Sequence, residues 1–223
     1  STLLAQVQAA GIPVFPSATA TGTRGRLRVS AVGISRVEGG VVSNPEWLDC
    51  DALLMSGGWT PSVHLHSQSR GKVVWSGERQ AFLPGGSVQA ERSAGACNGT
   101  FALAEVLADG HDAGAEAAGE GSARTFAVAG DAGTTGGALG RMPRHPGATG
   151  KAFVDFQNDV KAEDIELAVQ EGMRSIEHVK RYTTTGMATD QGKTSNLNAL
   201  AIAAEKLGKP IPEVGLTTFR QPY

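Results

Sequence analysis

The chain has 223 residues, 40% of them hydrophobic, and a formal net charge of −2 at pH 7. This length suits one large domain or two small ones, and the slightly negative charge argues against a nucleic-acid-binding protein, which usually carries a basic patch. No apolar run approaches the ~20 residues that a membrane-spanning helix needs, and no secretory signal pattern is visible, so we expect a cytoplasmic protein without a membrane contact.

The first part of the chain predicts short helices and strands. Apolar residues at helical spacing predict a helix over residues 1–10 that Gly11 ends. Residues 12–15 predict a short buried strand, and residues 27–34 predict hairpin strands. Residues 51–56 form a compact apolar run, which predicts another buried strand.

Two glycine turns follow. Gly57 and Gly58 come directly after the predicted strand, where open α/β sheets bind ligands. Residues 95–99 form the second turn and precede a predicted helix over residues 100–118. Free backbone N–H groups at such a turn can hold a pyrophosphate. The Gly-x-Gly-x-x-Gly fingerprint is absent, so ordinary turns are an equal alternative.

The middle of the chain is rich in glycine. We expect the helix over residues 100–118 to break near Gly110, because glycine costs about 1 kcal/mol relative to alanine in a helix. Residues 126–129 predict a last short strand. Residues 130–150 contain seven glycines and two prolines, a composition typical of a linker.

Helical spacing returns after residue 150. It predicts one helix that ends at Gly172, a second that Ser175 caps, and a third over residues 197–207 that begins at Ser195 or Asn196. Three short helices form a small domain with a limited core of its own.

A polar loop over residues 182–196 separates the last two helices. Its Gly-Lys-Thr resembles the end of a P-loop, but a P-loop requires glycine where this chain has Met187. Lys193 and the hydroxyls of Thr194 and Ser195, next to a helix N-terminus, could bind an anion. Alternatively, the hydroxyls only cap the helix and the lysine is solvated.

The remaining reactive side chains predict no catalytic and no metal site. His64 and His66 lie two residues apart without a cysteine or carboxylate at a typical ligand spacing. His178 lies on a charged helix face, where we expect it to be solvated. Cys50 and Cys97 are too far apart for a Cys-x-x-Cys pair and too few for a four-thiolate site, so we expect reduced thiols and no disulfide oxidoreductase activity.

The C-terminal part resembles the α subunit of heterotetrameric sarcosine oxidases. The resemblance rests on residues 153–160 (FVDFQNDV), 175–196 and 212–220. Residues 51–60 and 94–118 resemble the end of the dinucleotide-binding region of that subunit, and the first 50 residues match loosely. The resemblance implies that the chain is a section of a longer subunit.

The resemblance also implies the domain organisation. We expect an α/β fold in which residues 1–126 are the C-terminal part of an NAD-binding domain of the pyridine nucleotide-disulfide oxidoreductase type. Residues 127–151 would be a glycine-rich linker. Residues 152–223 would form the small three-helix domain.

The activity that the resemblance implies is the oxidative demethylation of sarcosine to glycine, with release of hydrogen peroxide and one-carbon transfer to tetrahydrofolate. The complex would contain this subunit with β, γ and δ subunits. NAD would bind to the α subunit, whereas FAD and covalently attached FMN would bind to the β subunit. The FMN would lie near the interface between α and β. The amine would be oxidised on β, so we expect no catalytic residue here. The alternative is a structural and interaction module without a nucleotide site.

The helical domain is also similar to [2Fe–2S] modules of related amine and opine dehydrogenase subunits. Where those carry cluster cysteines, this chain has Asp155, Gln157, Asp190 and Ser195. None of the four is a thiolate, so the resemblance implies no cluster. It assigns the loop a contact with a flavin or with the β subunit instead.

Two groups of cofactor contacts are therefore expected. The residues expected to contact NAD are Gly57, Gly58, Trp59, Gly95 and Ala96. The residues expected to approach FMN or the subunit interface are Thr184, Thr185, Gly186, Met187, Lys193 and Thr194.

Overall fold

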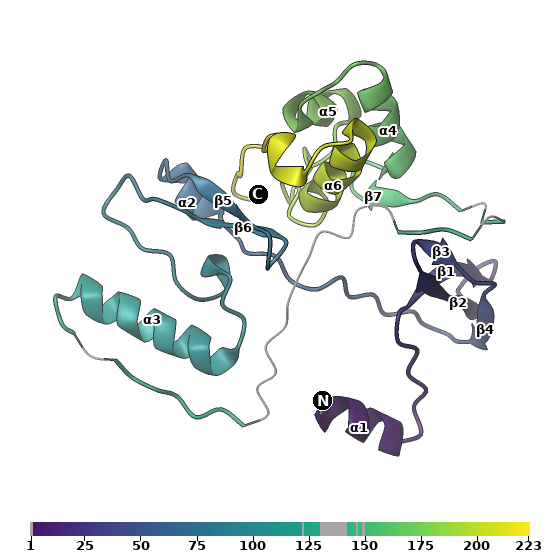
Figure 1. Ribbon diagram of the computed structural model, residues 1–223, viewed down its shortest axis with the longest axis horizontal. Helices are drawn as coiled ribbons and strands as arrows, with labels where there is room; N and C mark the ends of the chain where they lie inside the picture. The colour runs from purple at the N-terminus through teal and green to yellow at the C-terminus, as the bar shows by residue number, and fades with distance from the viewer. Residues whose placement is uncertain (1, 122, 130–141, 146, 149) are drawn as a thin grey trace. The chain divides into compact units, whose positions relative to one another are not determined.

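The computed structural model describes residues 2–121, 123–129, 142–145, 147–148 and 150–223. The chain divides into two compact units, drawn together in Figure 1. Unit 1 consists of Ser1–Met55 and Met142–Lys151, and unit 2 consists of Ser56–Arg141 and Ala152–Tyr223. Most of the glycine-rich stretch predicted as a linker lies outside the described residues, and the predicted boundaries at residues 126 and 151 stay a prediction.

Unit 1 is built on an antiparallel sheet in which β2 is the central strand. It pairs with β1, β3 and β4. The sheet follows the predicted N-terminal helix, and Gly11 ends that helix at a φ of +72°. The bounds are α1 Thr2–Ala9, β1 Ala18–Arg24, β2 Ala31–Glu38, β3 Val41–Val42 and β4 Glu46–Asp49.

Three strand predictions in the first 60 residues need correction. Residues 12–15 form no strand, and Ile12 is 54% exposed. The hairpin strands predicted over residues 27–34 lie over Ala18–Arg24 and Ala31–Glu38 instead. Residues 51–56 also form no strand. An apolar run forms a buried strand only where a neighbouring strand pairs with its backbone groups. In this part of the chain β2 pairs with β4, which ends at Asp49, before residues 51–56 begin.

Unit 2 begins with a short helix and a hairpin, followed by a single-turn helix and a longer helix. The longer helix, α3, continues through Gly110, so the break predicted there is wrong. A glycine penalty of about 1 kcal/mol is small against a helix of this length. Residues 126–129 form no strand. The bounds are α2 His64–Gln68, β5 Val73–Ser76, β6 Ala81–Pro84, η1 Gly95–Asn98 and α3 Leu103–Ala117.

The rest of unit 2 contains a small hairpin and three helices (Figure 1). The helices lie where the helical spacing predicts them, whereas the hairpin β7–β8 has no counterpart among the predicted elements. Gly172 and Gly208 follow their helices with φ values of +99° and +63°. The bounds are β7 Phe153–Asp155, β8 Val160–Lys161, α4 Ala162–Gln170, α5 Ile176–Thr183, α6 Asn196–Leu207 and η2 Ile211–Glu213.

The hydrophobic core of unit 2 lies between α4, α5 and α6. Ile165, Val179 and Ala203 are fully buried in it. Phe82 from β6 belongs to the same core, and Trp75 from β5 packs against it with the two rings 4.9 Å apart. The hairpin β5–β6 and the three helices therefore form one folding unit. Within the described residues, no helix combines the length and apolarity that crossing a membrane requires.

Replacing Ser175 with alanine should lower the free energy of unfolding by about 0.5–1 kcal/mol. The Ser175 hydroxyl accepts a hydrogen bond from the His178 N–H at 3.4 Å and so caps α5, as predicted. Ser195 is the matched control, because it precedes α6 but its side chain makes no cap hydrogen bond. Urea unfolding should show a loss for Ser175→Ala and none for Ser195→Ala; equal losses would contradict the capping role.

Candidate functional site

The loop between α5 and α6 is a series of tight turns. Backbone hydrogen bonds close turns from Met187 to Thr184 and from Gln191 to Ala188. Gly186 has a φ of +68°, and a Cβ atom there would lie 2.1 Å from the Asn196 Oδ1. Gly192 is restricted in the same way. The glycines are therefore needed for the loop to fold back against the first turn of α6.

Asp155 holds this loop against the hairpin β7–β8. Its side chain is only 3% exposed. One carboxylate oxygen accepts the Gly186 N–H at 2.7 Å, and the other accepts the N–H groups of Gln157 at 2.9 Å and Asn158 at 3.1 Å. Charge-assisted hydrogen bonds of this kind are stronger than neutral ones, so Asp155 fixes where the loop lies.

Gln157 and Asp190 extend the same polar network. The Gln157 side-chain oxygen accepts hydrogen bonds from the Thr189 hydroxyl at 3.0 Å and the Asp190 N–H at 3.4 Å. Ser195 is buried, with 1% of its surface exposed, and its hydroxyl has no hydrogen-bond partner among the described residues. Three of the four residues that the resemblance would place at cluster-cysteine positions, Asp155, Gln157 and Asp190, are thus joined by hydrogen bonds. The described residues contain no group of three or more His, Cys, Asp or Glu suited to a metal ion.

The Asp190 carboxylate organises the second half of the loop. It accepts the Gly192 N–H at 2.9 Å and the Thr194 hydroxyl at 2.8 Å. Burial raises the pKa of Asp190, but these hydrogen bonds and the Lys193 charge outweigh it, so the pKa lies below its usual value. Thr194, expected near FMN, therefore uses its hydroxyl within the loop.

Lys193 and His64 line one cavity of about 140 Å³. His64 is 7% exposed, and its Nδ1 lies 3.2 Å from the Ser62 hydroxyl. The His64 Nε2 and the Lys193 Nζ are buried, and neither has a hydrogen-bond partner in the described part of the chain. Burial lowers the pKa of both groups, and the Lys193 charge lowers that of His64 further.

Met187 lines a different, outer groove of about 510 Å³. Lys180, Arg181 and Arg220 supply three positive charges to this groove, and Glu177 supplies one negative charge. Burial lowers the pKa of Lys180. The positive charges of Arg220 and Arg181 lower this pKa further, whereas the negative charge of Glu177 raises it. The groove is therefore a site that favours an anionic group.

The structure distributes the residues expected near FMN over the loop rather than in one pocket. Met187 lines the outer groove and Lys193 the inner cavity. Thr185 is fully buried, whereas Thr184 is exposed and its carbonyl accepts the Asn158 side-chain amide at 2.9 Å. The assignment of these residues to FMN stays a prediction.

The residues expected to contact NAD lie in two places. Gly57, Gly58 and Trp59 are exposed and follow no strand. Gly95 and Ala96 lie in η1, where the Gly95 N–H donates to the Asp109 carboxylate at 2.6 Å. That N–H is therefore already hydrogen-bonded, and the NAD contacts stay a prediction.

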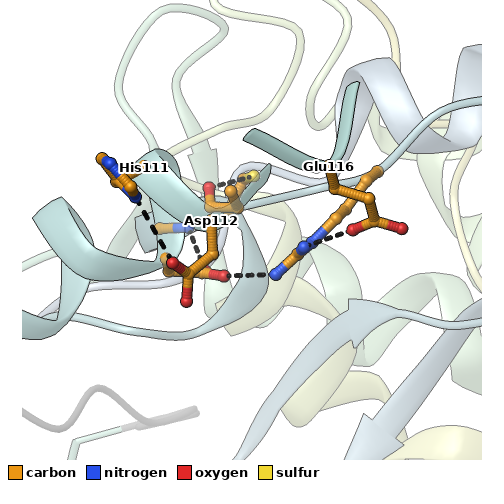
Figure 2. Close-up of polar contacts among 8 residues, drawn as sticks. His111, Asp112 and Glu116 are labelled. Carbon is orange, nitrogen blue, oxygen red and sulfur yellow. Dashed lines mark hydrogen bonds and ion pairs between the residues drawn. The ribbon is translucent and has the colours of Figure 1, made fainter. Parts of the chain in front are cut away.

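Asp109 belongs to a polar cluster along α3. Figure 2 shows this cluster with His111, Asp112 and Glu116 labelled. Arg92 bridges Asp109, at 3.2 Å, to Glu116. The two ion pairs fix the segment before η1 against α3, which is a structural role.

Sequence reasoning missed the partnership of His64 and Lys193. The spacing around His64 predicts no metal site, and Lys193 is predicted only as a cation of the loop. They lie far apart in the sequence and no spacing rule connects them. The local sequence contains no signal for the pair beyond the presence of the two side chains.

Comparison with solved structures shows that another protein chain contains this fold. The chain resembles a chain in the crystal structure of L-proline dehydrogenase from P. horikoshii, with a TM-score of 0.65 and 18% sequence identity. The match covers 99% of this chain and 45% of the other. The fold is thus an α/β fold shared with part of a dehydrogenase chain.

Sequence comparison is more specific. Residues 149–223 match the model of the sarcosine oxidase A3 domain. A sarcosine oxidase subunit alpha from Rhizobium meliloti (strain 1021) is 41% identical over 220 residues, and one from Corynebacterium sp. (strain P-1) is 35% identical over 235 residues. These matches cover 92% and 100% of this chain but 21% and 24% of the relatives. The resemblance to sarcosine oxidase α subunits is confirmed, and the chain spans about a fifth of their length.

Proposed function

We propose that the chain is a section of the α subunit of a sarcosine oxidase, which converts sarcosine to glycine by oxidative demethylation. The observation that carries the proposal is sequence similarity to such subunits across nearly the whole chain. NAD would bind to this subunit, FAD and FMN to a β subunit, and the one-carbon unit would pass to tetrahydrofolate; γ and δ subunits would complete the complex.

The test is reconstitution of the complex. The complete subunit that contains this section would be co-expressed with the proposed β, γ and δ subunits, and sarcosine-dependent hydrogen peroxide release would be measured. Activity that requires all subunits supports the proposal. A pure, flavin-loaded complex that leaves sarcosine unchanged but oxidises another secondary amine would reject sarcosine as the substrate.

The outer groove is the place in this chain best suited to the flavin-bearing subunit. It combines the positive charges of Lys180, Arg181 and Arg220 with the exposed side chain of Met187. A flavin phosphate or an acidic surface would complement those charges, and an isoalloxazine edge or apolar side chain would cover the methionine. The predicted FMN contact at Met187 belongs to this groove.

Replacing Arg220 with glutamine should weaken FMN retention or β-subunit binding by about five- to tenfold, because the groove loses one of its positive charges. Arg174→Gln is the matched control, since Arg174 is also exposed but does not line the groove. FMN content after gel filtration and the affinity for β at two salt concentrations would be measured. Equal behaviour of both variants would exclude the groove from the interface.

A structural module without a nucleotide site is the second candidate function. It is favoured by the hydrogen bond that already engages the Gly95 N–H and by the absence of a strand before Gly57. Equilibrium dialysis of the complete α subunit with NAD separates the two candidates. We expect saturable binding that Gly95→Ala weakens; no binding at millimolar NAD would favour the structural module.

A further inference from the structure

The inner cavity of unit 2 has apolar walls and a polar end. Phe82, Leu200, Leu216 and Phe219 contribute to the walls. The polar end carries Lys193 and His64, and no carboxylate is among the described residues that line the cavity. The negative charge that acts on Lys193 is that of Asp190, which accepts hydrogen bonds within the loop and does not line the cavity.

Two buried donors at that end lack acceptors. The Lys193 ammonium can donate three hydrogen bonds, yet its Nζ is buried without a partner in the described residues. If the Ser62 hydroxyl donates to His64 Nδ1, 3.2 Å away, the neutral imidazole carries its proton on Nε2. That Nε2 is also buried without a partner there. Buried polar groups are normally hydrogen-bonded, so both atoms indicate an acceptor that the described residues do not supply.

We propose that this cavity binds a small organic monocarboxylate, whose oxygens accept hydrogen bonds from Lys193 Nζ and His64 Nε2 and whose apolar body contacts Phe82 and Leu200. The volume of about 140 Å³ is close to that of an engineered cavity that holds benzene, about 150 Å³. The ligand therefore has roughly the size of benzene. A phosphate would place more charge against these apolar walls than one ammonium compensates.

This carboxylate site goes beyond the proposed function, because it involves neither the outer groove nor a flavin. Its recognition needs only the loop conformation that Asp155 and Asp190 maintain. The cavity lies wholly within unit 2. Binding to it can therefore be measured whether or not the chain acts on sarcosine.

Butanoate is the probe, because it equals benzene in its number of non-hydrogen atoms, and butanamide is its uncharged analogue. Titration by calorimetry of the complete subunit that contains this chain should show saturable butanoate binding in the millimolar range. Butanamide should bind at least about tenfold more weakly, since hydrogen bonds to charged groups are stronger than neutral ones. Lys193→Gln should weaken butanoate binding by a similar factor. Lys206→Gln, on the last turn of α6, is the control and should change nothing.

A second variant keeps the proposal testable if Lys193→Gln fails to fold. Leu197 lines the cavity at the start of α6, and Leu197→Phe should fill the space and abolish butanoate binding. The proposal is overturned if butanoate shows no saturable binding to the unmodified chain. It is also overturned if butanamide binds as tightly as butanoate, or if folded Lys193→Gln or Leu197→Phe chains bind with unchanged affinity.

Discussion

Replacing Ile165 with alanine is expected to lower the free energy of unfolding of unit 2 by about 2–5 kcal/mol. Ile165 is fully buried in α4 and belongs to the core formed with α5 and α6. The truncation removes buried methyl and methylene groups and leaves a cavity that helices packed on all sides cannot easily close. A loss of this size is a large part of the stability of a domain of this kind.

The measurement is urea unfolding followed by far-UV circular dichroism, which reports the helices of unit 2. Leu167→Ala is the matched control, because Leu167 lies in the same helix but is 45% exposed. The control should cost less than Ile165→Ala, since alanine is the better helix former and the truncation removes less buried area. Similar losses for the two variants would show that α4 does not pack as described.

The C-terminal helices were predictable because their signals are local. The apolar residues of α4, α5 and α6 recur at helical spacing, Ser175 supplies a cap, and Gly172 and Gly208 end helices with positive φ. Each signal operates within one or two turns and needs no knowledge of the rest of the fold. The strand predicted over residues 51–56 failed for the opposite reason, since a strand requires a partner that may lie anywhere in the chain.

The candidate site was predictable in part. The loop over residues 182–196 could be identified as polar, rich in hydroxyl groups and joined to the N-terminus of α6. Its division into an outer groove around Met187 and an inner cavity around Lys193 could not be predicted. That division depends on residues brought in by tertiary packing, such as His64 and Phe219, whose rings lie 5.4 Å apart.

Replacing Asp155 with asparagine is expected to lower the free energy of unfolding by about 2–3 kcal/mol and to loosen the loop. The carboxylate accepts hydrogen bonds through both oxygens, from Gly186 on one side and from Gln157 and Asn158 on the other. An asparagine amide has a single acceptor oxygen. In either orientation its NH₂ group therefore faces a backbone N–H that has lost its acceptor.

Asp159→Asn is the matched control, because it removes the same charge from an exposed residue of the same hairpin. Amide hydrogen exchange provides the site-specific measurement. The Gly186 N–H, which donates to Asp155 at 2.7 Å, should exchange much faster in Asp155→Asn and at the original rate in Asp159→Asn. Unchanged protection of Gly186 would contradict the anchoring role.

The Asp155→Asn variant also tests how the outer groove and the inner cavity depend on the loop. Asp155 holds Gly186, and Gly186 lies between the residue that reaches the outer groove, Met187, and the buried Thr185. The inner cavity depends on Lys193 at the other end of that loop, which the Asp190 carboxylate organises through Gly192 and Thr194. Loosening at Asp155 should therefore weaken flavin-subunit binding at the groove more than butanoate binding in the cavity. Equal weakening at both places would mean that the loop moves as one rigid body, and the reverse order would contradict the division of the loop into two parts.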